Sequence, residues 1–457
     1  MSRDFDLVCI GSGPAGQRAA VQAAKLRHRV AVVEKRRCLG GVCVETGTIP
    51  SKTFREAVLW YAELKRRGYP TRPAAAELLA RVDQVTRREQ ELIDDQLRRN
   101  DVTVIHGEAA FTGPHTIAVA SELDVRTVSA DRFIVAVGTM PAPPPGVAAD
   151  GEVVITSDDV VRLRELPRTL AVVGGGVIGI EYASMFAALG VHVTLVERRE
   201  RPLDFADREI VDELIHQMRA HQVTFRVGEA VAFIEVTSAP RRSAVLVLES
   251  GKRIVADMAM FSAGRVAATA RLRLEAAGLT GDERGRLAVD ATFRTAVPHI
   301  YAAGDVIGYP SLAATSSEQG RLAACHAFGI KTGPMARHFP VGIYAVPELS
   351  MVGAPEHELT RERVPYEVGL ARYREIARGQ IMEDDTGLLK LLFDREDGRL
   401  LGVHAIGSGA TELIHVGQAV LGLGGGLDYF METVFNYPTL AECYKVAALD
   451  AHNKLQR

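Results

Sequence analysis

The chain has 457 residues, enough for two or three domains, and its 54 Lys and Arg residues nearly balance its 57 Asp and Glu residues. This balance excludes a strongly basic nucleic-acid-binding protein, and no uncharged apolar run is long enough to predict a membrane span. The five scattered cysteines do not predict a disulfide scaffold, and the acidic N-terminus does not resemble a signal peptide. These features predict a soluble, cytoplasmic protein.

The first forty residues predict a β-α-β unit with a dinucleotide-binding turn. A short strand leads into Gly11-Ser-Gly13-Pro-Ala-Gly16, an alanine-rich helix follows, and a second strand ends at Glu34. In such a turn the first glycine permits the tight bend, the second lets a pyrophosphate approach the backbone, and the third lets the helix pack on the strand. We expect the pyrophosphate at the helix N-terminus and a ribose hydroxyl at Glu34.

The same unit occurs a second time. A strand leads into Gly174-Gly-Gly176-Val-Ile-Gly179, and the strand after the next helix ends at Glu197. The two turns lie too far apart for one β-α-β unit, so they predict two doubly wound domains. Two dinucleotide sites on one chain suit one permanent and one exchangeable cofactor, with electrons passing between them.

The rest of the chain contains no third turn of this kind. A charged helix over 74–99, a proline-rich linker at 141–145 and one strand over 254–262 are predicted. Beyond residue 340 the pattern becomes mixed α+β and ends in a helix over 439–453, which suggests docking or dimerisation. The thirteen histidines show no metal-ligand spacing, so no metal site is expected.

The two turns, together with three further segments, resemble the flavin-dependent pyridine nucleotide–disulfide oxidoreductases over essentially the whole chain. The further segments are Gly40-Gly-Val-Cys43 with Gly47-Thr-Ile-Pro-Ser-Lys52, Phe133-Ile-Val-Ala-Val-Gly138, and Ile300-Tyr-Ala-Ala-Gly-Asp305. The resemblance implies an α/β fold with two Rossmann-like domains and a C-terminal α+β dimerisation domain. The implied boundaries are an FAD-binding domain over 1–145 and 266–336, an NAD(P)-binding domain over 146–265, and a homodimer interface domain over 337–457.

The resemblance also assigns site residues. One FAD per subunit and exchangeable NAD and NADP are implied, with Lys52 near the reactive flavin edge and Glu181 as its ion-pair partner. Asp305 matches the acid that accepts a hydrogen bond from the ribityl chain. The helix opened by 311–317 points at the flavin, with Ser311 as its expected cap. The predicted cofactor-binding set is Gly11, Gly13, Gly16, Glu34, Lys35, Gly41, Cys43, Thr48, Lys52, Gly138, Gly174, Gly176, Gly179, Glu181, Glu197, Arg198, Gly264, Asp305, Leu312 and Ala313.

The thiol chemistry of the family is not predicted for this chain. Members that reduce disulfides carry two cysteines five positions apart, and here the pair reads Cys43 and Thr48. The family's acid/base histidine near the C-terminus is replaced by Tyr437, whose phenol titrates far above neutral pH. A hydride path between nicotinamide and flavin remains. In this the chain resembles the soluble pyridine nucleotide transhydrogenases, which share Gly-Thr-Ile-Pro-Ser-Lys and Asn-Tyr-Pro-Thr and pass hydride between NADPH and NAD⁺.

The sequence leaves other functional hypotheses open. Cys38 and Cys43 are also five apart, but Cys38 falls in the loop after Glu34, so a disulfide between them is not favoured. Cys43 alone suits a flavin oxidase or peroxidase that forms a sulfenic acid. A dihydrolipoyl-dehydrogenase-like diaphorase and a nucleotide-binding protein with little turnover are further alternatives.

The residues after the second turn predict how two coenzymes share one site. An acid at the position of Glu197 normally binds the ribose 2′-hydroxyl of NAD, and a nearby arginine admits the 2′-phosphate of NADP. Glu197 is followed directly by Arg198 and Arg199. We therefore expect Glu197 to bind the hydroxyl of NAD⁺ and Arg198 the phosphate of NADPH; the alternative is that both arginines begin a polar surface loop.

Overall fold

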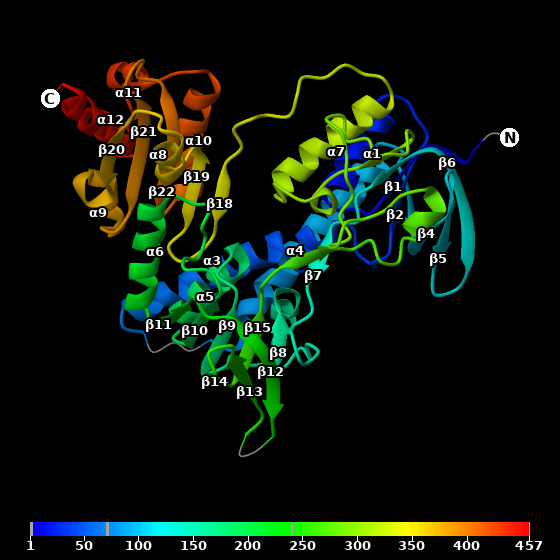
Figure 1. Cartoon of the computed structure of the whole chain (residues 1–457), viewed down its shortest axis with the longest axis horizontal. Helices are drawn as coiled ribbons and strands as arrows, with labels where there is room; N and C mark the ends of the chain where they lie inside the picture. Colours follow the sequence, from blue (N-terminus) through cyan, green and yellow to red (C-terminus); the bar gives the residue numbers. More distant parts are fainter. Residues whose placement is uncertain (1–2, 70–72, 239–240, 457) are drawn as a thin grey trace.

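The computed structural model describes residues 3–69, 73–238 and 241–456 of the chain. It confirms the predicted α/β class: two parallel sheets carry the dinucleotide turns, and a separate antiparallel sheet forms the C-terminal part. The first unit and the C-terminal sheet lie at opposite ends of the molecule, with the second unit between and below them in Figure 1.

The first unit has a parallel sheet that is completed by a late segment of the chain. Its hydrogen-bonded order begins β3-β2-β1-β6, and β17 pairs with the other edge of β6. The first half of β6 continues into an antiparallel extension with β5 and β4. The strands are β1 (Phe5–Ile10), β2 (Val30–Glu34), β3 (Thr103–His106), β4 (Glu108–Gly113), β5 (Thr116–Ala120), β6 (Val125–Val135) and β17 (Ile300–Ala302).

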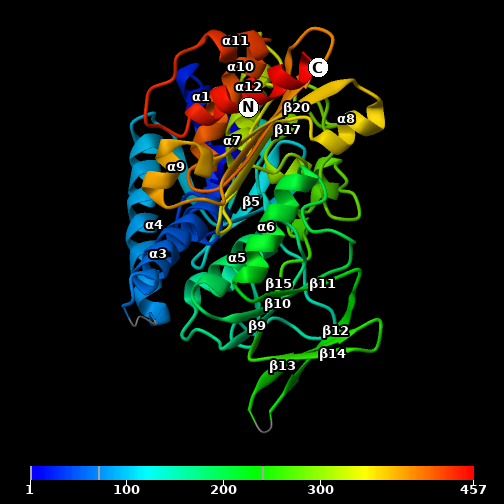
Figure 2. The ribbon, with the colours of Figure 1, turned by 90° about the vertical axis from the view of Figure 1, so that its left-hand side faces the viewer.

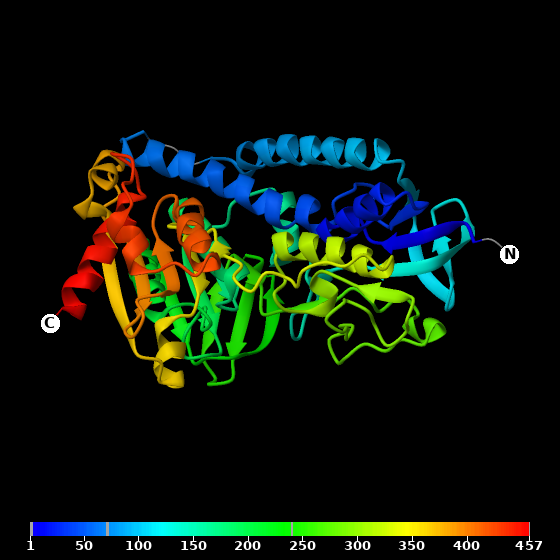
Figure 3. The ribbon, with the colours of Figure 1, turned by 90° about the horizontal axis from the view of Figure 1, so that it is seen from above.

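The antiparallel strands β4 and β5 cover one face of this first sheet, and the other face is covered by helices. The helices of this unit are α1 (Pro14–Lys25), α2 (Gly41–Glu45), α3 (Thr48–Arg66), α4 (Ala75–Arg98) and α7 (Ala313–Ala327). The helices α1 and α7 pack at close range, because a Cβ at Gly320 would lie 2.1 Å from the carbonyl oxygen of Ala15. The helices α3 and α4 run together along one side of the molecule (Figure 3). The helix α3 extends from the first unit toward α5 of the second unit.

The second unit repeats the plan of the first with a five-stranded parallel sheet. Its order is β11-β10-β9-β15-β8, with α5 (Val177–Ala188) and α6 (Arg208–Ala220) packed on it. A separate antiparallel layer, β12-β13-β14, lies far from α11 and α12 (Figure 2). The strands are β8 (Val154–Thr156), β9 (Thr169–Val173), β10 (His192–Glu197), β11 (Val223–Val227), β12 (Val231–Thr237), β13 (Ser243–Leu248), β14 (Arg253–Ala256) and β15 (Met258–Phe261).

The single strand predicted over 254–262 is wrong. The segment divides at Asp257 into β14 of the antiparallel layer and β15 of the parallel sheet. The Asp257 carboxylate accepts hydrogen bonds from the backbone amides of Arg168 and Thr169, and the Thr169 hydroxyl accepts one from the Asp257 amide. This exchange with the start of β9 fixes the corner where the chain changes sheets.

The two crossings between the units lie side by side. The outgoing segment forms β7 (Thr139–Pro141), and the returning segment forms β16 (Arg265–Ala267). They pair as a two-stranded antiparallel ribbon, with Thr139 opposite Ala267 and Pro141 opposite Arg265. Residues of both strands of this ribbon line the cavity described below.

The C-terminal part is an antiparallel sheet of order β18-β19-β22-β21-β20 with helices packed against it. Its strands are β18 (Val341–Ile343), β19 (Leu349–Gly353), β20 (Tyr366–Arg372), β21 (Leu388–Asp394) and β22 (Leu400–Ile406). Its helices are α8 (Glu356–Glu362), α9 (Ala377–Met382), α10 (Ala410–Gly422), α11 (Leu427–Glu432) and α12 (Glu442–Leu455). Within the residues described, no helix is both long and apolar enough to cross a membrane.

Candidate active site

One large cavity collects residues from all three parts of the molecule. Its volume is about 1090 Å³, and it runs from the first dinucleotide turn to the start of α5 and to β18. A space of this size is at the upper end of small-molecule sites, as an extended dinucleotide requires. Most of the predicted cofactor residues of the first unit line it: Gly11, Gly13, Glu34, Lys35, Gly41, Cys43, Thr48, Lys52, Gly138, Asp305, Leu312 and Ala313.

The first turn forms a cradle that side chains would fill. Gly11 has a φ of +105°, and a Cβ there would lie 2.4 Å from the carbonyl oxygen of Ala136. A Cβ at Gly16 would lie 1.9 Å from the oxygen of Gly11, so the third glycine allows the helix to pack, as predicted. A Cβ at Gly13, in contrast, would meet nothing within 4 Å. Gly13 is the N-cap of α1 and lines the cavity, so the unoccupied space at the N-terminus of this helix fits a pyrophosphate.

The acid at the end of β2 is held ready for a hydroxyl group. Glu34 is buried, and its Oε2 accepts hydrogen bonds from the amide and the hydroxyl of Ser12. Its Oε1 accepts one from the amide of Arg36. A carboxylate has about four acceptor positions, so one remains for a ribose hydroxyl. The residues of this end of the cavity therefore fit the adenosine half of FAD.

The predicted pair of Lys52 and Glu181 is formed. The Lys52 ammonium, on α3, lies 2.8 and 2.9 Å from the two carboxylate oxygens of Glu181, on α5 of the second unit. The Glu181 side chain is almost completely buried, and its Oε1 also accepts a hydrogen bond from the amide of Tyr344. The Lys52 ammonium lies 4.8 Å from the centre of the Tyr344 ring. This ion pair therefore joins all three parts of the molecule at the cavity wall.

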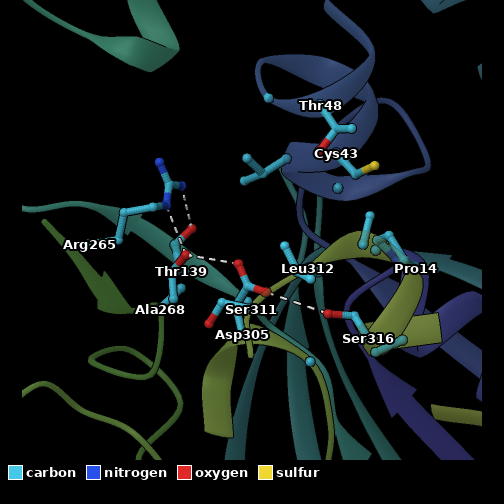
Figure 4. A pocket seen from close by; sticks show the side chains of 18 of the residues that line it. Pro14, Cys43, Thr48, Thr139, Arg265, Ala268, Asp305, Ser311, Leu312 and Ser316 are labelled. Atoms are coloured by element: carbon cyan, nitrogen blue, oxygen red, sulfur yellow. Dashed lines mark hydrogen bonds between the residues drawn. The ribbon is translucent and has the colours of Figure 1, made fainter. Parts of the chain in front are cut away.

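Asp305 belongs to a chain of hydrogen bonds that the sequence did not reveal (Figure 4). Its carboxylate accepts long contacts of 3.4 Å from the hydroxyls of Thr139 and Ser316. Arg265 in turn donates to the hydroxyl and the carbonyl of Thr139, at 2.9 and 3.0 Å. Burial raises the pKa of Asp305, and the charge of Arg265 opposes that rise. Asp305 lines the cavity.

The redox-active disulfide of the family is absent here. All five cysteines are free thiols, so Cys38 and Cys43 are not joined. Cys43 lies on α2 and Thr48 begins α3, and both line the cavity. Burial raises the pKa of the Cys43 thiol, against the opposing effect of the hydrogen bond from Thr48. A thiol with a raised pKa is a weak nucleophile at neutral pH, which argues against the oxidase or peroxidase reading.

The predicted cap of α7 is wrong. The helix begins at Ala313 with Leu312 as the N-cap, whereas Ser311 adopts a φ of +48° and donates its hydroxyl to the carbonyl of Gly308. The amide of Leu312 instead contacts the hydroxyl of Thr315. Leu312 and Ala313 still line the cavity, so the positive end of the helix dipole faces it as predicted.

The second turn repeats the geometry of the first, outside the cavity. A Cβ at Gly179 would lie 1.9 Å from the oxygen of Gly174, and a Cβ at Gly176 would meet nothing within 4 Å. Glu197 is buried, but its carboxylate is engaged by the guanidinium of Arg199. Arg198 is exposed, and within the described ranges no acidic side chain pairs with it.

Some predicted positions lie elsewhere, and some lining residues were missed. Gly16, Gly174, Gly176, Gly179, Glu197, Arg198 and Gly264 do not line the cavity, although Arg265, next to Gly264, does. Tyr437 is exposed and lies outside the cavity of its own chain. Thr139, Arg265 and Tyr344 were missed; proximity to Gly138 and Gly264 is the only sequence signal for the first two. In the part of the chain that is described, no cluster of potential metal ligands is found.

Comparison with known proteins gives the same arrangement over the full length. Residues 5–320 match the family model described as pyridine nucleotide-disulphide oxidoreductase, and residues 339–448 match the dimerisation domain of that family. A protein of Mycobacterium tuberculosis (strain ATCC 25177 / H37Ra) named soluble pyridine nucleotide transhydrogenase is 53% identical, covering 99% of this chain and 98% of its own. A protein of the same name from Photobacterium profundum is 42% identical over the same shares of both chains.

Solved structures show the same fold. The crystal structure of LpdA from Mycobacterium tuberculosis is 28% identical and has a TM-score of 0.90, covering 97% of this chain and 99% of that one. The HOCl-induced flavoprotein disulfide reductase RclA from Escherichia coli is 26% identical with a TM-score of 0.88, at the same coverage.

Proposed function

Because the chain belongs to the pyridine nucleotide-disulphide oxidoreductase family, we propose that it transfers hydride between NADPH and NAD⁺ through FAD held in the cavity, as a soluble NAD(P)⁺ transhydrogenase. The observation that carries this proposal is the wall of the cavity. The Lys52–Glu181 pair is present, while the second redox cysteine is replaced by Thr48. The names of the relatives at 53% and 42% identity support the same reaction.

The residues of the first unit would hold the cofactor. FAD, when bound, supplies a carrier that accepts a hydride from one nicotinamide and returns it to another. Gly13 and the start of α1 would face its pyrophosphate, Glu34 and Lys35 its adenosine, and Asp305 its ribityl chain. The first turn of α7, from Leu312, would place partial positive charge at the flavin edge that becomes negative on reduction.

Lys52 and Glu181 would position the reacting groups. Glu181 accepts from Lys52 and from the Tyr344 amide, so the ammonium is held in one place and its charge is partly balanced. In hydride transfer the protein chiefly fixes orientation and electrostatics, and a restrained ammonium does both. We propose Lys52 and Glu181 as the residues that align the nicotinamide with the flavin.

We also propose the organisation of the working protein. FAD binding falls to residues 1–145 and 266–336, NAD(P) binding to 146–265, and a homodimer interface to 337–457; the match of 339–448 to a dimerisation domain supports the last assignment. NADPH, NADH, NAD⁺ and NADP⁺ are its small-molecule partners, and the cytoplasm is its compartment.

The test is an anaerobic, thiol-free assay of NADPH-driven reduction of thionicotinamide adenine dinucleotide by the purified yellow protein. We expect turnover without oxygen or dithiol, and we expect Glu181→Gln to slow it at least about ten-fold while flavin content is retained. The matched control is Glu235→Gln, which removes the carboxylate of a surface pair with Arg253. Turnover that appears only with oxygen or peroxide would replace this proposal with the oxidase reading, and none under any condition would overturn it.

A further inference from the structure

The two dinucleotide turns share one detail that lies beyond the glycines. In each unit the acid that ends the second strand is followed, two residues later, by an arginine: Arg36 after Glu34 and Arg199 after Glu197. In each unit the backbone amide of that arginine donates to Oε1 of the acid, at 2.9 and 2.8 Å. The two acids are therefore held in equivalent ways, and the arginine side chains can be compared directly.

The two arginine side chains take different partners. The guanidinium of Arg36 pairs with Glu45 on α2, so it leaves the Glu34 carboxylate with three hydrogen bonds and one unused acceptor position. The guanidinium of Arg199 lies on Glu197 itself: Nε is 2.9 Å from Oε1 and Nη2 is 3.1 Å from Oε2.

The Glu197 carboxylate therefore has all its hydrogen-bond acceptor positions occupied. Its Oε2 accepts from the Gly175 amide and from Arg199, and its Oε1 accepts from the amide and the side chain of Arg199. These four contacts use the about four acceptor positions of a carboxylate. A ribose 2′-hydroxyl could donate to Glu197 only if the Arg199 guanidinium moved away.

The same guanidinium also contacts a second carboxylate. Nη1 of Arg199 lies 2.6 Å from Oδ1 of Asp204, whose side chain is 53% exposed while that of Glu197 is 7% exposed. The backbone between them is pinned, because Gly228 donates to the carbonyl of Arg199 and buried Leu203 donates to that of Gly175. Arg199 can therefore release Glu197 and keep Asp204 by side-chain rotation alone, with the loop in place.

We infer that Arg199 determines which coenzyme the second site accepts, by either contacting Glu197 and Asp204 together or releasing Glu197 and keeping Asp204 alone. In contact with both, it neutralises the carboxylate beside the 2′-position, which suits the 2′-phosphate of NADP(H), with Arg198 as the predicted phosphate partner. On Asp204 alone it leaves Glu197 open to the 2′-hydroxyl of NAD(H), as Glu45 leaves Glu34 open by holding Arg36. The inference rests on the proposed function, because only a protein that uses both coenzymes needs both arrangements.

Two variants with opposite effects test the inference, by calorimetric titration of the flavin-loaded protein with NAD⁺ and with NADP⁺. Asp204→Asn removes the second carboxylate, so we expect the Kd for NAD⁺ to rise about two- to five-fold while that for NADP⁺ stays level or falls. Arg199→Met leaves Glu197 bare, so we expect the Kd for NADP⁺ to rise about five-fold or more while NAD⁺ binding is retained. Asp212→Asn, which removes the partner of nearby Arg201, is the matched control and leaves both constants unchanged.

The outcomes separate this inference from the proposed function. Equal effects on the two coenzymes, or effects of both variants on the same coenzyme, would overturn the role of Arg199. If Arg199→Met fails to fold, Arg199→Gln also removes the positive charge beside Glu197 and must raise the Kd for NADP⁺ selectively. Shifted constants in a protein that transfers no hydride would refute the proposed function alone, and a wild-type protein that binds neither coenzyme would refute both.

Discussion

At the scale of single residues, the positions of the charged groups around the second turn define what each arginine can do. Arg199 is committed to carboxylates, whereas Arg198 extends into solvent beside the same strand end. Only a guanidinium without an acidic partner is available to a phosphate without first breaking an ion pair. We therefore propose the phosphate contact for Arg198 and the control of Glu197 for Arg199.

The Arg198→Ala variant tests that assignment. A charge-assisted contact between arginine and phosphate is about twice as strong as a neutral hydrogen bond, and losing about 1.4 kcal/mol corresponds to a factor of ten. We expect the Michaelis constant for NADPH to rise about ten-fold or more and that for NADH to stay nearly constant. Steady-state kinetics with each coenzyme measures both; an equal change for the two would place the phosphate contact elsewhere.

The sequence predicts residues well where one residue type is required by its own backbone. Gly11, Gly16 and Gly179 were predicted because no side chain fits their turns, and the structure confirms those close contacts. Arg265 and Tyr344 could not be predicted, because their roles depend on Thr139 and Glu181 arriving from other parts of the chain. The ion pair of Arg199 with Glu197 could not be predicted either, because it depends on the side-chain conformation of Arg199.

At the scale of elements, the start of α1 is the feature on which cofactor binding depends most directly. The helix offers unpaired amides at its first turn, and Gly13 leaves the space before them open. A Cβ at Gly13 would meet no other atom within 4 Å, so a substitution by alanine can test cofactor binding without disturbing the fold.

We expect Gly13→Ala to fold normally and to be purified with little or no flavin. The extended backbone of Gly13 (φ −66°, ψ 179°) is accessible to alanine, but the new methyl group would occupy the ground where a pyrophosphate must lie. Flavin absorbance of the purified protein and its Tm measure the two effects. Gly333→Ala is the control, because its Cβ also meets nothing within 4 Å but lies outside the cavity. Full flavin content in Gly13→Ala would contradict the placement of the pyrophosphate.

Two predicted features of the elements failed, one because of a contact with a distant segment and one because of a local contact. The stretch over 254–262 reads as one strand, yet the contacts of Asp257 with β9 divide it between two sheets. Ser311 has the composition of a cap, yet its hydroxyl is used by Gly308 and the helix begins one residue later than expected. A tertiary contact decided the first outcome, whereas a local hydrogen bond between residues three apart decided the second.

At the scale of the whole molecule, a buried ion cluster attaches the second unit to the C-terminal sheet. Lys390 of β21 is fully buried and lies 3.1 Å from Asp207, the N-cap of α6, with Glu209 and Glu356 completing the cluster. Burial alone would raise the pKa of Asp207, but the charges of His404 and Lys390 and the hydrogen bonds to its carboxylate hold it below its ordinary value. The carboxylate therefore stabilises the folded state when it is ionised.

We expect acid to remove this stabilisation. A carboxyl whose pKa is lowered by folding contributes fully above its unfolded pKa of 3.8 and loses its contribution as the pH falls through the folded value, so the loss lies below about pH 4. Asp207→Asn removes the charge at every pH. Its Tm at pH 7 should fall, by an amount corresponding to about 1–3 kcal/mol, and its Tm should depend less on pH below 4 than that of the wild type. Identical acid profiles for the two proteins would contradict this role.

The missing thiol chemistry concerns both subunits of the proposed dimer, because disulfide reductases of this family take their acid/base group from the second subunit. Here two changes coincide: Thr48 stands where the second redox cysteine would be, and exposed Tyr437 stands where the histidine would be. A hydroxyl cannot exchange with a disulfide, and a phenol that titrates near pH 10 is a poor proton shuttle at neutral pH. Each change alone would block the reaction.

We therefore expect no turnover of dihydrolipoamide or glutathione disulfide at rates comparable with hydride transfer between nicotinamides. Thr48→Cys alone should remain inactive toward both, because the thiol pair would still lack its proton acceptor. Thr48→Cys combined with Tyr437→His restores both parts, so its disulfide-linked oxidation of NADH should exceed that of either single variant. Anaerobic assays of the four proteins with each substrate measure this. Efficient disulfide reduction by the wild type would contradict the argument from Thr48 and Tyr437. Efficient reduction by Thr48→Cys without the histidine would contradict the argument from Tyr437.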